Sequence, residues 1–419
     1  MTRRSLLPAL LLLILSPNIM CQTVEAACPS DELDNIAREV VELKPTDISA
    51  LTQRAESGEP EAQFTLALAY ESGFGVEKDS NAAFVWVSKA ARAGYALAEN
   101  ELGSMFASGD GTKKDDVEAL RWLRKAAEQG YAGAQYNVGI QYAYGHGTER
   151  DFNEAARWFQ KAAAQCDVKA ADKLGRMSLF GEGVPKSDAA AAKWFRQAAD
   201  AGLSDGEYHL GNLYRHGTGV PKDATQAVQW LMKAAEHGNV EAQTNLANMI
   251  LEGDGTKKDC ASGMRWLTKA AEAGDDAGQN DLGYQYSHGD CVSKDKKTAF
   301  TWYLKAAEQG LAQAEATVGA AYDEGFGVKR DQTKAVEWFK KAAEDGHVEA
   351  QFNLAVMYAK AQGTPRDVVS SYQWLLLAER GGHGDEGLKS LLESGLTPEQ
   401  RREAEERAAN WLAQHSANQ

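Results

Sequence analysis

The residues best arranged for covalent chemistry are Ser293 and Lys296, which are separated by two residues. Penicillin-recognising enzymes place a nucleophilic serine and a lysine at this spacing. The Lys-Asp pair between them, however, belongs to a loop sequence that recurs along the chain, for example at Lys78-Asp79. We therefore interpret the segment as a loop and predict that the chain has no catalytic residue and is not an enzyme.

The histidines, cysteines and glycines show no spacing typical of a metal or cofactor site. Neither His-Glu-x-x-His nor paired Cys-x-x-Cys occurs among the eight histidines and five cysteines. The recurrent Gly-x-Gly pairs follow a predicted helix and precede an acidic residue, whereas a dinucleotide site needs a strand before them. We predict no metal and no cofactor.

Tryptophan recurs every 36 residues, and this spacing sets the frame for the whole chain. A fixed period between 20 and 50 residues indicates a stack of identical supersecondary units. A tenth tryptophan, Trp411, is one residue out of register. The nine tryptophans in register are Trp86, Trp122, Trp158, Trp194, Trp230, Trp266, Trp302, Trp338 and Trp374.

Each 36-residue block predicts two helices. In residues 239–274 the first helix has Ala242, Leu246, Ala247 and Ile250 on one face. A glycine ends this helix, and an aspartate or serine then caps the second helix, which carries the tryptophan and an Ala-Ala pair. We expect Glu118, Glu154 and Gln226, three residues after such caps, to complete capping boxes. The predicted fold is an all-α solenoid of helix-turn-helix repeats.

The repeat resembles the Sel-one-like repeat, a relative of the tetratricopeptide repeat. Residues 311–346, LAQAEATVGAAYDEGFGVKRDQTKAVEWFKKAAEDG, follow the family pattern almost throughout, and the resemblance extends over residues 59–382 in nine copies. It implies a right-handed superhelix of helix pairs. It also implies an adaptor that holds peptides or protein partners, rather than an enzyme.

The ends of the chain depart from the repeat. Residues 1–26 have a charged start, a short apolar segment and a cleavage site at Val24-Glu25-Ala26, as in a signal peptide. Arg3-Arg4 leaves twin-arginine export open as an alternative. We predict N-terminal capping helices in residues 27–58 and C-terminal capping helices in residues 383–419. The product is expected in the periplasm or outside the cell, without a transmembrane segment.

The acidic composition excludes one class of partner. Sixty Asp and Glu residues against 45 Lys and Arg give a formal net charge of −15. Such a surface repels a phosphate backbone, so we do not expect nucleic acid as a partner.

The candidate binding surface is the concave wall that the first helices are expected to form, at the positions that vary from copy to copy. Asparagine can bond both backbone groups of an extended peptide, and aromatic side chains serve as anchors. An ordinary solvated helix face is the alternative interpretation. The predicted groove residues are Asn137, Ile140, Tyr144, Arg176, Phe180, His209, Asn212, His216, Asn245, Asn248 and Tyr284.

Two cysteines are candidates for a disulfide. Cys260 and Cys291 fall in the predicted inter-helix loops of adjacent repeats, and export permits disulfides. We hypothesise that they are bonded and clasp the two repeats together. Cys28 and Cys166 are the remaining combination.

The sequence thus favours an exported, monomeric scaffold that binds a protein or peptide. By resemblance, it would regulate an envelope signalling or secretion complex, or engage a host factor. Two alternatives stay open: a β-lactam-binding or β-lactam-hydrolysing enzyme of the cysteine-rich branch of the family, and a scaffold associated with peptidoglycan or polysaccharide.

Overall fold

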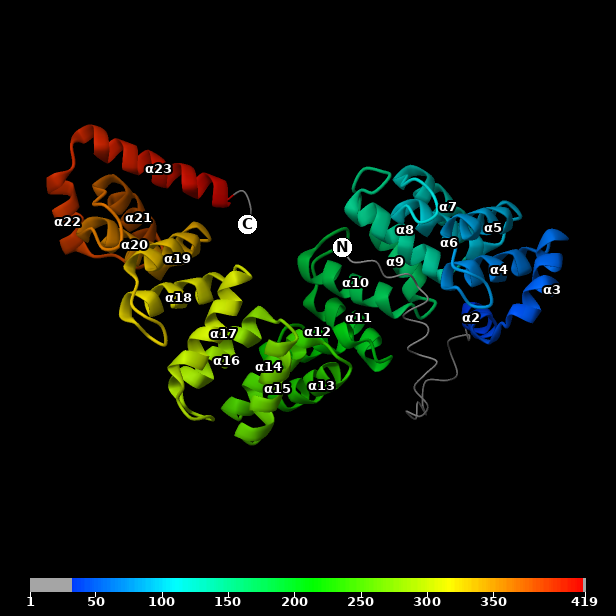
Figure 1. Ribbon diagram of the computed structural model, residues 1–419, viewed down its shortest axis with the longest axis horizontal. Helices are drawn as coiled ribbons and strands as arrows, with labels where there is room; N and C mark the ends of the chain where they lie inside the picture. The colour runs from blue at the N-terminus through cyan, green and yellow to red at the C-terminus, as the bar shows by residue number, and fades with distance from the viewer. Residues whose placement is uncertain (1–31, 417–419) are drawn as a thin grey trace. The chain divides into compact units, whose positions relative to one another are not determined.

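The computed structural model describes residues 32–416 as 22 α-helices, with no strand in that range (Figure 1). The leader predicted for residues 1–26 and the cysteine Cys28 lie outside the described residues. No helix within the described range is long and apolar enough to cross a membrane. The predicted all-α fold of stacked helix-turn-helix repeats is confirmed.

The chain divides into two compact units at Lys222 and Asp223. The helices of the first unit are α2 (Glu32–Glu42), α3 (Pro45–Glu56), α4 (Pro60–Ser72), α5 (Ser80–Arg92), α6 (Ala96–Ser108), α7 (Asp116–Glu128), α8 (Ala132–Tyr144), α9 (Phe152–Ala163), α10 (Val168–Phe180), α11 (Asp188–Asp200) and α12 (Ser204–His216).

The second unit begins with a second helix of a repeat and ends with two helices that follow the last repeat. Its helices are α13 (Ala224–Glu236), α14 (Val240–Glu252), α15 (Cys260–Glu272), α16 (Asp276–His288), α17 (Lys296–Glu308), α18 (Ala312–Glu324), α19 (Gln332–Glu344), α20 (Val348–Lys360), α21 (Val368–Arg380), α22 (Glu386–Gly395) and α23 (Pro398–Ser416).

The loop inside each repeat is fixed by a glycine and an acidic cap. In the third repeat Gly145 ends α8 with φ 73°, a left-handed conformation that glycine adopts without strain. The Asp151 side chain then accepts hydrogen bonds from the backbone N–H groups of Asn153 and Glu154 at 2.9 and 3.1 Å. The backbone N–H of Asp151 donates to the carbonyl of Tyr142 at 2.9 Å, which ties the start of α9 to α8.

This last bond explains why the expected capping boxes do not form at Glu118 and Glu154. A capping box needs the backbone N–H of the cap residue, and in these repeats that group is already bonded to the first helix. The Glu118 and Glu154 side chains instead pair with Arg121 and Arg157. Gln226 likewise turns to another side chain, Gln229.

The tryptophans pack between repeats. Trp122 is 6% exposed and lies in one cluster with Val87 and Ala90 of the preceding repeat and with Leu102 of its own repeat. The ammonium of Lys125, one helical turn later, lies 3.9 Å from the centre of the Trp122 ring. The same Lys-over-Trp contact recurs at Lys89, Lys161, Lys233, Lys269, Lys305 and Lys341.

A glutamine near the start of the first helix forms a second bridge between repeats. The Gln135 amide nitrogen donates to the carbonyl of Ala127 at the end of α7, at 3.2 Å. Its amide oxygen accepts from Gln165 at 2.8 Å, and Gln165 also donates to the carbonyl of Gly130. The bond to the preceding helix recurs at Gln63, Gln243, Gln279 and Gln351.

A disulfide joins Cys260 to Cys291 in the second unit, with the Cα atoms 5.2 Å apart. One expectation was inexact: Cys260 is the first residue of α15 and not a loop residue. Cys166 is also disulfide-bonded. It adopts φ 67° at a position where other repeats carry a left-handed glycine such as Gly130.

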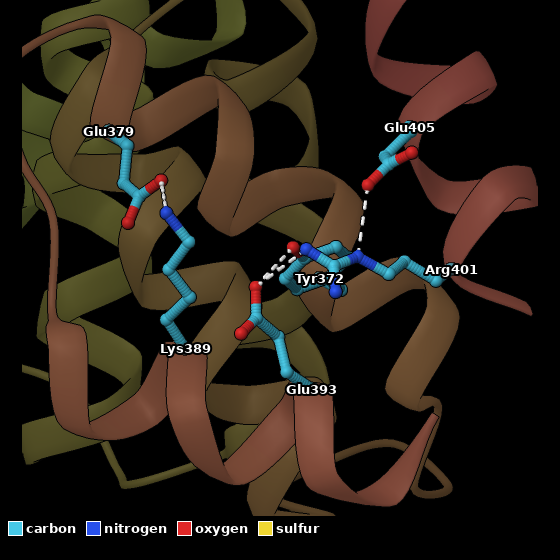
Figure 2. A network of polar contacts seen from close by, with 6 residues as sticks. All are labelled: Tyr372, Glu379, Lys389, Glu393, Arg401 and Glu405. Atoms are coloured by element: carbon cyan, nitrogen blue, oxygen red, sulfur yellow. Dashed lines mark hydrogen bonds and ion pairs between the residues drawn. The ribbon is translucent and has the colours of Figure 1, made fainter. Parts of the chain in front are cut away.

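The C-terminal helices dock through a polar network (Figure 2). The buried Tyr372 of α21 donates its hydroxyl to Glu393 of α22 at 2.8 Å. Arg401 of α23 reaches the same carboxylate at 3.0 Å and pairs with Glu405 at 3.1 Å. A second ion pair, between Lys389 and Glu379, ties α22 to α21.

The last helix, α23, is capped at its start and partly buried along its length. Thr397 and Gln400 form a capping box, with bonds of 3.0 and 3.2 Å. The residues that α23 buries most completely are Ala404 and Ala408. Trp411 is half-buried and stacks on His415 with ring centres 3.7 Å apart.

Candidate functional site

Two exposed aromatic side chains stand at the ends of neighbouring first helices in the first unit. Tyr144 is the last residue of α8 and Phe180 is the last residue of α10. Their side chains are 58% and 67% exposed. His216 ends α12 at the equivalent position and is exposed as well. We call Tyr144, Phe180 and His216 the aromatic column.

The neighbouring positions provide charge and a smaller apolar contact. Arg176, one turn before Phe180 on α10, is exposed. Ile140, one turn before Tyr144 on α8, is half-buried. Exposed apolar side chains that lie together mark interaction sites, and aromatic and arginine side chains provide much of the binding energy in protein interfaces.

Two predicted groove residues of the first unit instead hold neighbouring first helices together. The Asn137 amide on α8 donates to Asn100 of α6 at 2.8 Å. His209 of α12 approaches the buried Asp172 of α10 to 3.6 Å, which is too long for a hydrogen bond. His209 also packs on Phe195, with ring centres 4.7 Å apart.

Burial disfavours the charged form of both His209 and Asp172. Burial, together with the Arg176 charge, lowers the pKa of His209 to about 4. Burial, together with the Asp205 charge, raises the pKa of Asp172 to about 6. His209 is therefore uncharged at neutral pH, and its role in this surface is packing rather than ion pairing.

A hollow of about 290 Å³ lies between α6 and α8. This is just below the range of about 300–1,000 Å³ typical of sites for drug-sized ligands. Its lining residues are Ser104, Ala107, Ser108, Leu123, Asn137, Ile140 and Gln141.

The second unit holds the other three predicted groove residues. Tyr284 of α16 is 46% exposed and stacks on His288, with ring centres 3.9 Å apart. The Asn248 amide of α14 donates to Asp281 of α16 at 2.7 Å. Asn245 is half-buried on α14, as Asn212 is on α12 in the first unit, and both have polar interactions of their own.

A hollow of about 230 Å³ lies between α14 and α16 and extends to the disulfide. Its lining residues are Asn248, Leu251, Glu252, Lys258, Tyr284, Gln285, Asp290 and Cys291. Gln141 and Gln285, which line the two hollows, were not among the predicted groove residues. The signal that would have found them is a polar residue in a column that other repeats fill with Ala, Leu or Met.

Three carboxylates lie close together near the start of the first unit. Burial, together with the charges of Glu71 and Asp110, raises the pKa of Glu101 on α6 to about 8. Burial also raises the pKa of Glu71 on α4. Glu101 occupies the same variable column as Asn137. This column is therefore polar in both repeats, but its side chain is acidic in one and neutral in the other.

The Ser293 and Lys296 motif is built as a loop and a helix start. Asp295 between them caps α17 and accepts from the backbone N–H groups of Lys297 and Thr298. The Lys296 ammonium lies 5.0 Å from the centre of the Phe326 ring. The role that the structure gives these residues is therefore structural.

Comparison with known proteins identifies the repeat. The family model for the Sel1 repeat matches nine times over residues 60–383. The crystal structure of a protective antigen of uropathogenic Escherichia coli, which displays a Sel1-like repeat fold, is 31% identical. The match covers 87% of this chain and 94% of that one, with a TM-score of 0.56.

A second solved structure is similar to the same degree. A Sel1 repeat protein from Oxalobacter formigenes is 30% identical, covers 83% of this chain and 99% of its own, and has a TM-score of 0.58. A search of curated proteins gives no match.

Proposed function

The chain belongs to the Sel1 repeat family, whose members are generally scaffolds for protein–protein interaction. On that premise, we propose that it binds a partner protein through the first helices of its first unit. The observation that carries the proposal is the aromatic column. Tyr144 and Phe180 expose more than half of their side chains at equivalent places in adjacent repeats. The family match confirms the resemblance seen in the sequence. Binding of a partner protein at this surface is our proposal.

The physical argument is that this surface provides anchors without disturbing the stack. The residues that hold the repeats together are buried, as at Trp122 and Gln135. Tyr144, Phe180 and Arg176 are exposed, so a partner can cover them without rearrangement of the core. Covering aromatic anchors with a partner side chain removes apolar area from water, which is the main favourable term in protein association.

The proposal is tested by placing a photo-reactive benzoylphenylalanine at Phe180 in one sample and at Val117 in another. Val117 is a matched control because it is 64% exposed but lies on the second helix α7. We expect the label at Phe180 to crosslink to one discrete protein in extracts of the source cells, and Tyr144→Ala to weaken that crosslink. Equal crosslinking from both positions would contradict the proposal.

We place this scaffold outside the cytoplasm. The pattern of residues 1–26 supports export, and disulfides such as Cys260–Cys291 persist in oxidising compartments. N-terminal sequencing of the protein from the periplasmic or secreted fraction is expected to begin at residue 27. An uncleaved protein in the cytoplasmic fraction would contradict this part of the proposal.

A further inference from the structure

Gln141 and Gln285 occupy one column of the first helix, exactly four repeats apart in the frame of the sequence. In the other repeats this column is apolar and packs inside the stack. Its members there are Ala69, Met105, Met177, Leu213, Met249, Ala321 and Met357. A neutral amide therefore replaces an apolar side chain twice, once in each unit.

Each of these glutamines lines a hollow, and the two hollows are built from equivalent positions. Ser104, Ala107, Ser108 and Ile140 around Gln141 correspond, four repeats later, to residues that surround Gln285. Those residues are Asn248, Leu251, Glu252 and Tyr284. The repeat has thus formed the same hollow between two adjacent first helices in both units.

Both glutamines carry an amide oxygen that is buried and has no hydrogen-bond partner among the described residues. Gln141 is only 7% exposed. The oxygens of Gln63 and Gln243 are also unpartnered, but their amide nitrogens bond to the preceding helix, so those side chains have a structural role. A buried acceptor without a donor costs free energy that the methionine of this column would not.

We propose that Gln141 and Gln285 are the acceptors of two equivalent sockets, in each of which the glutamine side chain turns its buried amide oxygen toward the hollow and binds an N–H group of an extended peptide together with the adjoining side chain. The inference rests on the proposed function, because it assigns the chemistry of the partner. Tyr144, the first residue of the aromatic column, ends the same helix α8 that carries Gln141, so one bound segment can reach both.

The size and walls of the hollows favour a peptide. At about 290 and 230 Å³ they are smaller than typical sites for whole small molecules, and each suits a single side chain. Around Gln141 the walls include Ala107, Leu123 and Ile140, which fit an aliphatic side chain. Backbone N–H groups are the donors that every extended peptide offers beside such a side chain.

The socket around Gln285 selects a different side chain. Asn248, Glu252, Lys258 and Asp290 make its lining polar. It therefore suits a residue with a polar end, whereas the socket around Gln141 suits an aliphatic one. The two sockets share the acceptor and differ in the side chain that they take.

The test uses the purified chain and a peptide of about twelve residues selected from a displayed random library for binding to it. The variant is Gln141→Met, which restores the residue that four other repeats carry in this column. We expect its Tm to rise by about 2–4 °C, because an unpaired buried acceptor is removed. We expect its affinity for the peptide to fall about three- to tenfold.

Two controls make the result specific. Gln243→Met removes a structural glutamine from the preceding-helix contact, so it should lower Tm and leave the affinity unchanged. The peptide is also methylated at each backbone nitrogen in turn. Methylation of the nitrogen whose N–H reaches Gln141 should weaken binding to the wild type. The same methyl group should leave the affinity of Gln141→Met unchanged, because that variant has already lost the acceptor.

The outcomes separate the inference from the proposed function. Unchanged affinity of Gln141→Met for a peptide whose binding depends on Phe180 overturns the sockets and leaves the proposed function standing. Recovery of no binding peptide, or binding only of soluble peptidoglycan fragments, contradicts both. A higher Tm with lower affinity, and non-additive N-methylation, supports the inference.

Discussion

The tryptophans and the aromatic column are two sets of aromatic side chains on the same repeats, with opposite environments. Four of the nine tryptophans in register, Trp122, Trp158, Trp230 and Trp374, are 6–8% exposed and the other five are half-buried, whereas Tyr144 and Phe180 are 58% and 67% exposed. The tryptophan position is filled alike in all nine repeats, and the column of Tyr144 varies from copy to copy.

The difference separates what holds the stack together from what can distinguish partners. A side chain present in every repeat gives each repeat the same contact and cannot mark one place on the molecule. A side chain that varies marks a place, and exposure makes it available. We therefore assign stability to the equivalent positions whose side chains are buried, and recognition to those whose side chains are exposed.

The largest effect is expected at a buried tryptophan. Trp230→Ala should lower the free energy of unfolding by about 3–5 kcal/mol, because it leaves a cavity where a large side chain was 7% exposed. Urea denaturation followed by circular dichroism measures it. A variant with the Tm of the wild type would show that this tryptophan is not part of the core.

The second-largest loss of stability is expected when the Cys260–Cys291 disulfide is removed. Replacing Cys260 and Cys291 with serine should cost about 3–4 kcal/mol in the chain-entropy model, since the bond closes a loop across 31 residues of sequence separation. Denaturation of the double variant, compared with each single variant, gives the value. Equal stability of the double variant and the wild type would assign the bond no role in clasping these repeats.

A smaller loss is expected at the glutamine bridge. Gln135→Ala removes the donor to the buried Ala127 carbonyl and should cost about 1–3 kcal/mol. The fourth repeat carries Ala171 at the same position, so the change introduces a residue that the frame already contains. Thermal unfolding measures the change, and a rise in Tm would contradict the bridge.

The carboxylates near Glu101 predict a pH dependence. The pKa of Glu101 is about 8 in the folded chain against an ordinary value of 4.5, so folding takes up a proton between these values. The contribution of this group to the free energy of unfolding is therefore greatest below about pH 4.5 and is lost as the pH rises through 8. Glu101→Gln should therefore raise Tm at pH 9 and change it little at pH 4. An equal change at both pH values would contradict the raised pKa.

The sequence predicted the fold because its signals are local and repeated. The left-handed glycines such as Gly145 and the caps such as Asp151 lie within one repeat, and the constant spacing of the tryptophans shows that this repeat recurs along the chain. The capping boxes at Glu118 and Glu154 were wrong for a reason outside the local pattern. The backbone group that they needed was already bonded to the first helix.

The candidate site was harder to predict because its contacts join different repeats. Asn137 and His209 are polar and variable, as a binding residue should be, but Asn137 is bonded to Asn100 and His209 packs on Phe195, both in the preceding repeat. Neither partner is visible in the repeat that carries the residue. Gln141 was overlooked because its column is apolar in most repeats, although the amide itself departs from that column.

The most direct test of the account is a comparison of Tyr144→Ala/Phe180→Ala with the wild type for binding a peptide selected from a displayed library. Both side chains are exposed, so Tm should match that of the wild type, with stability within about 0.5 kcal/mol. Isothermal titration calorimetry should show an affinity at least about tenfold weaker, because each truncated anchor costs about 1 kcal/mol or more. An unchanged affinity in a variant of unchanged stability would contradict the claim that the exposed aromatic column recognises the partner.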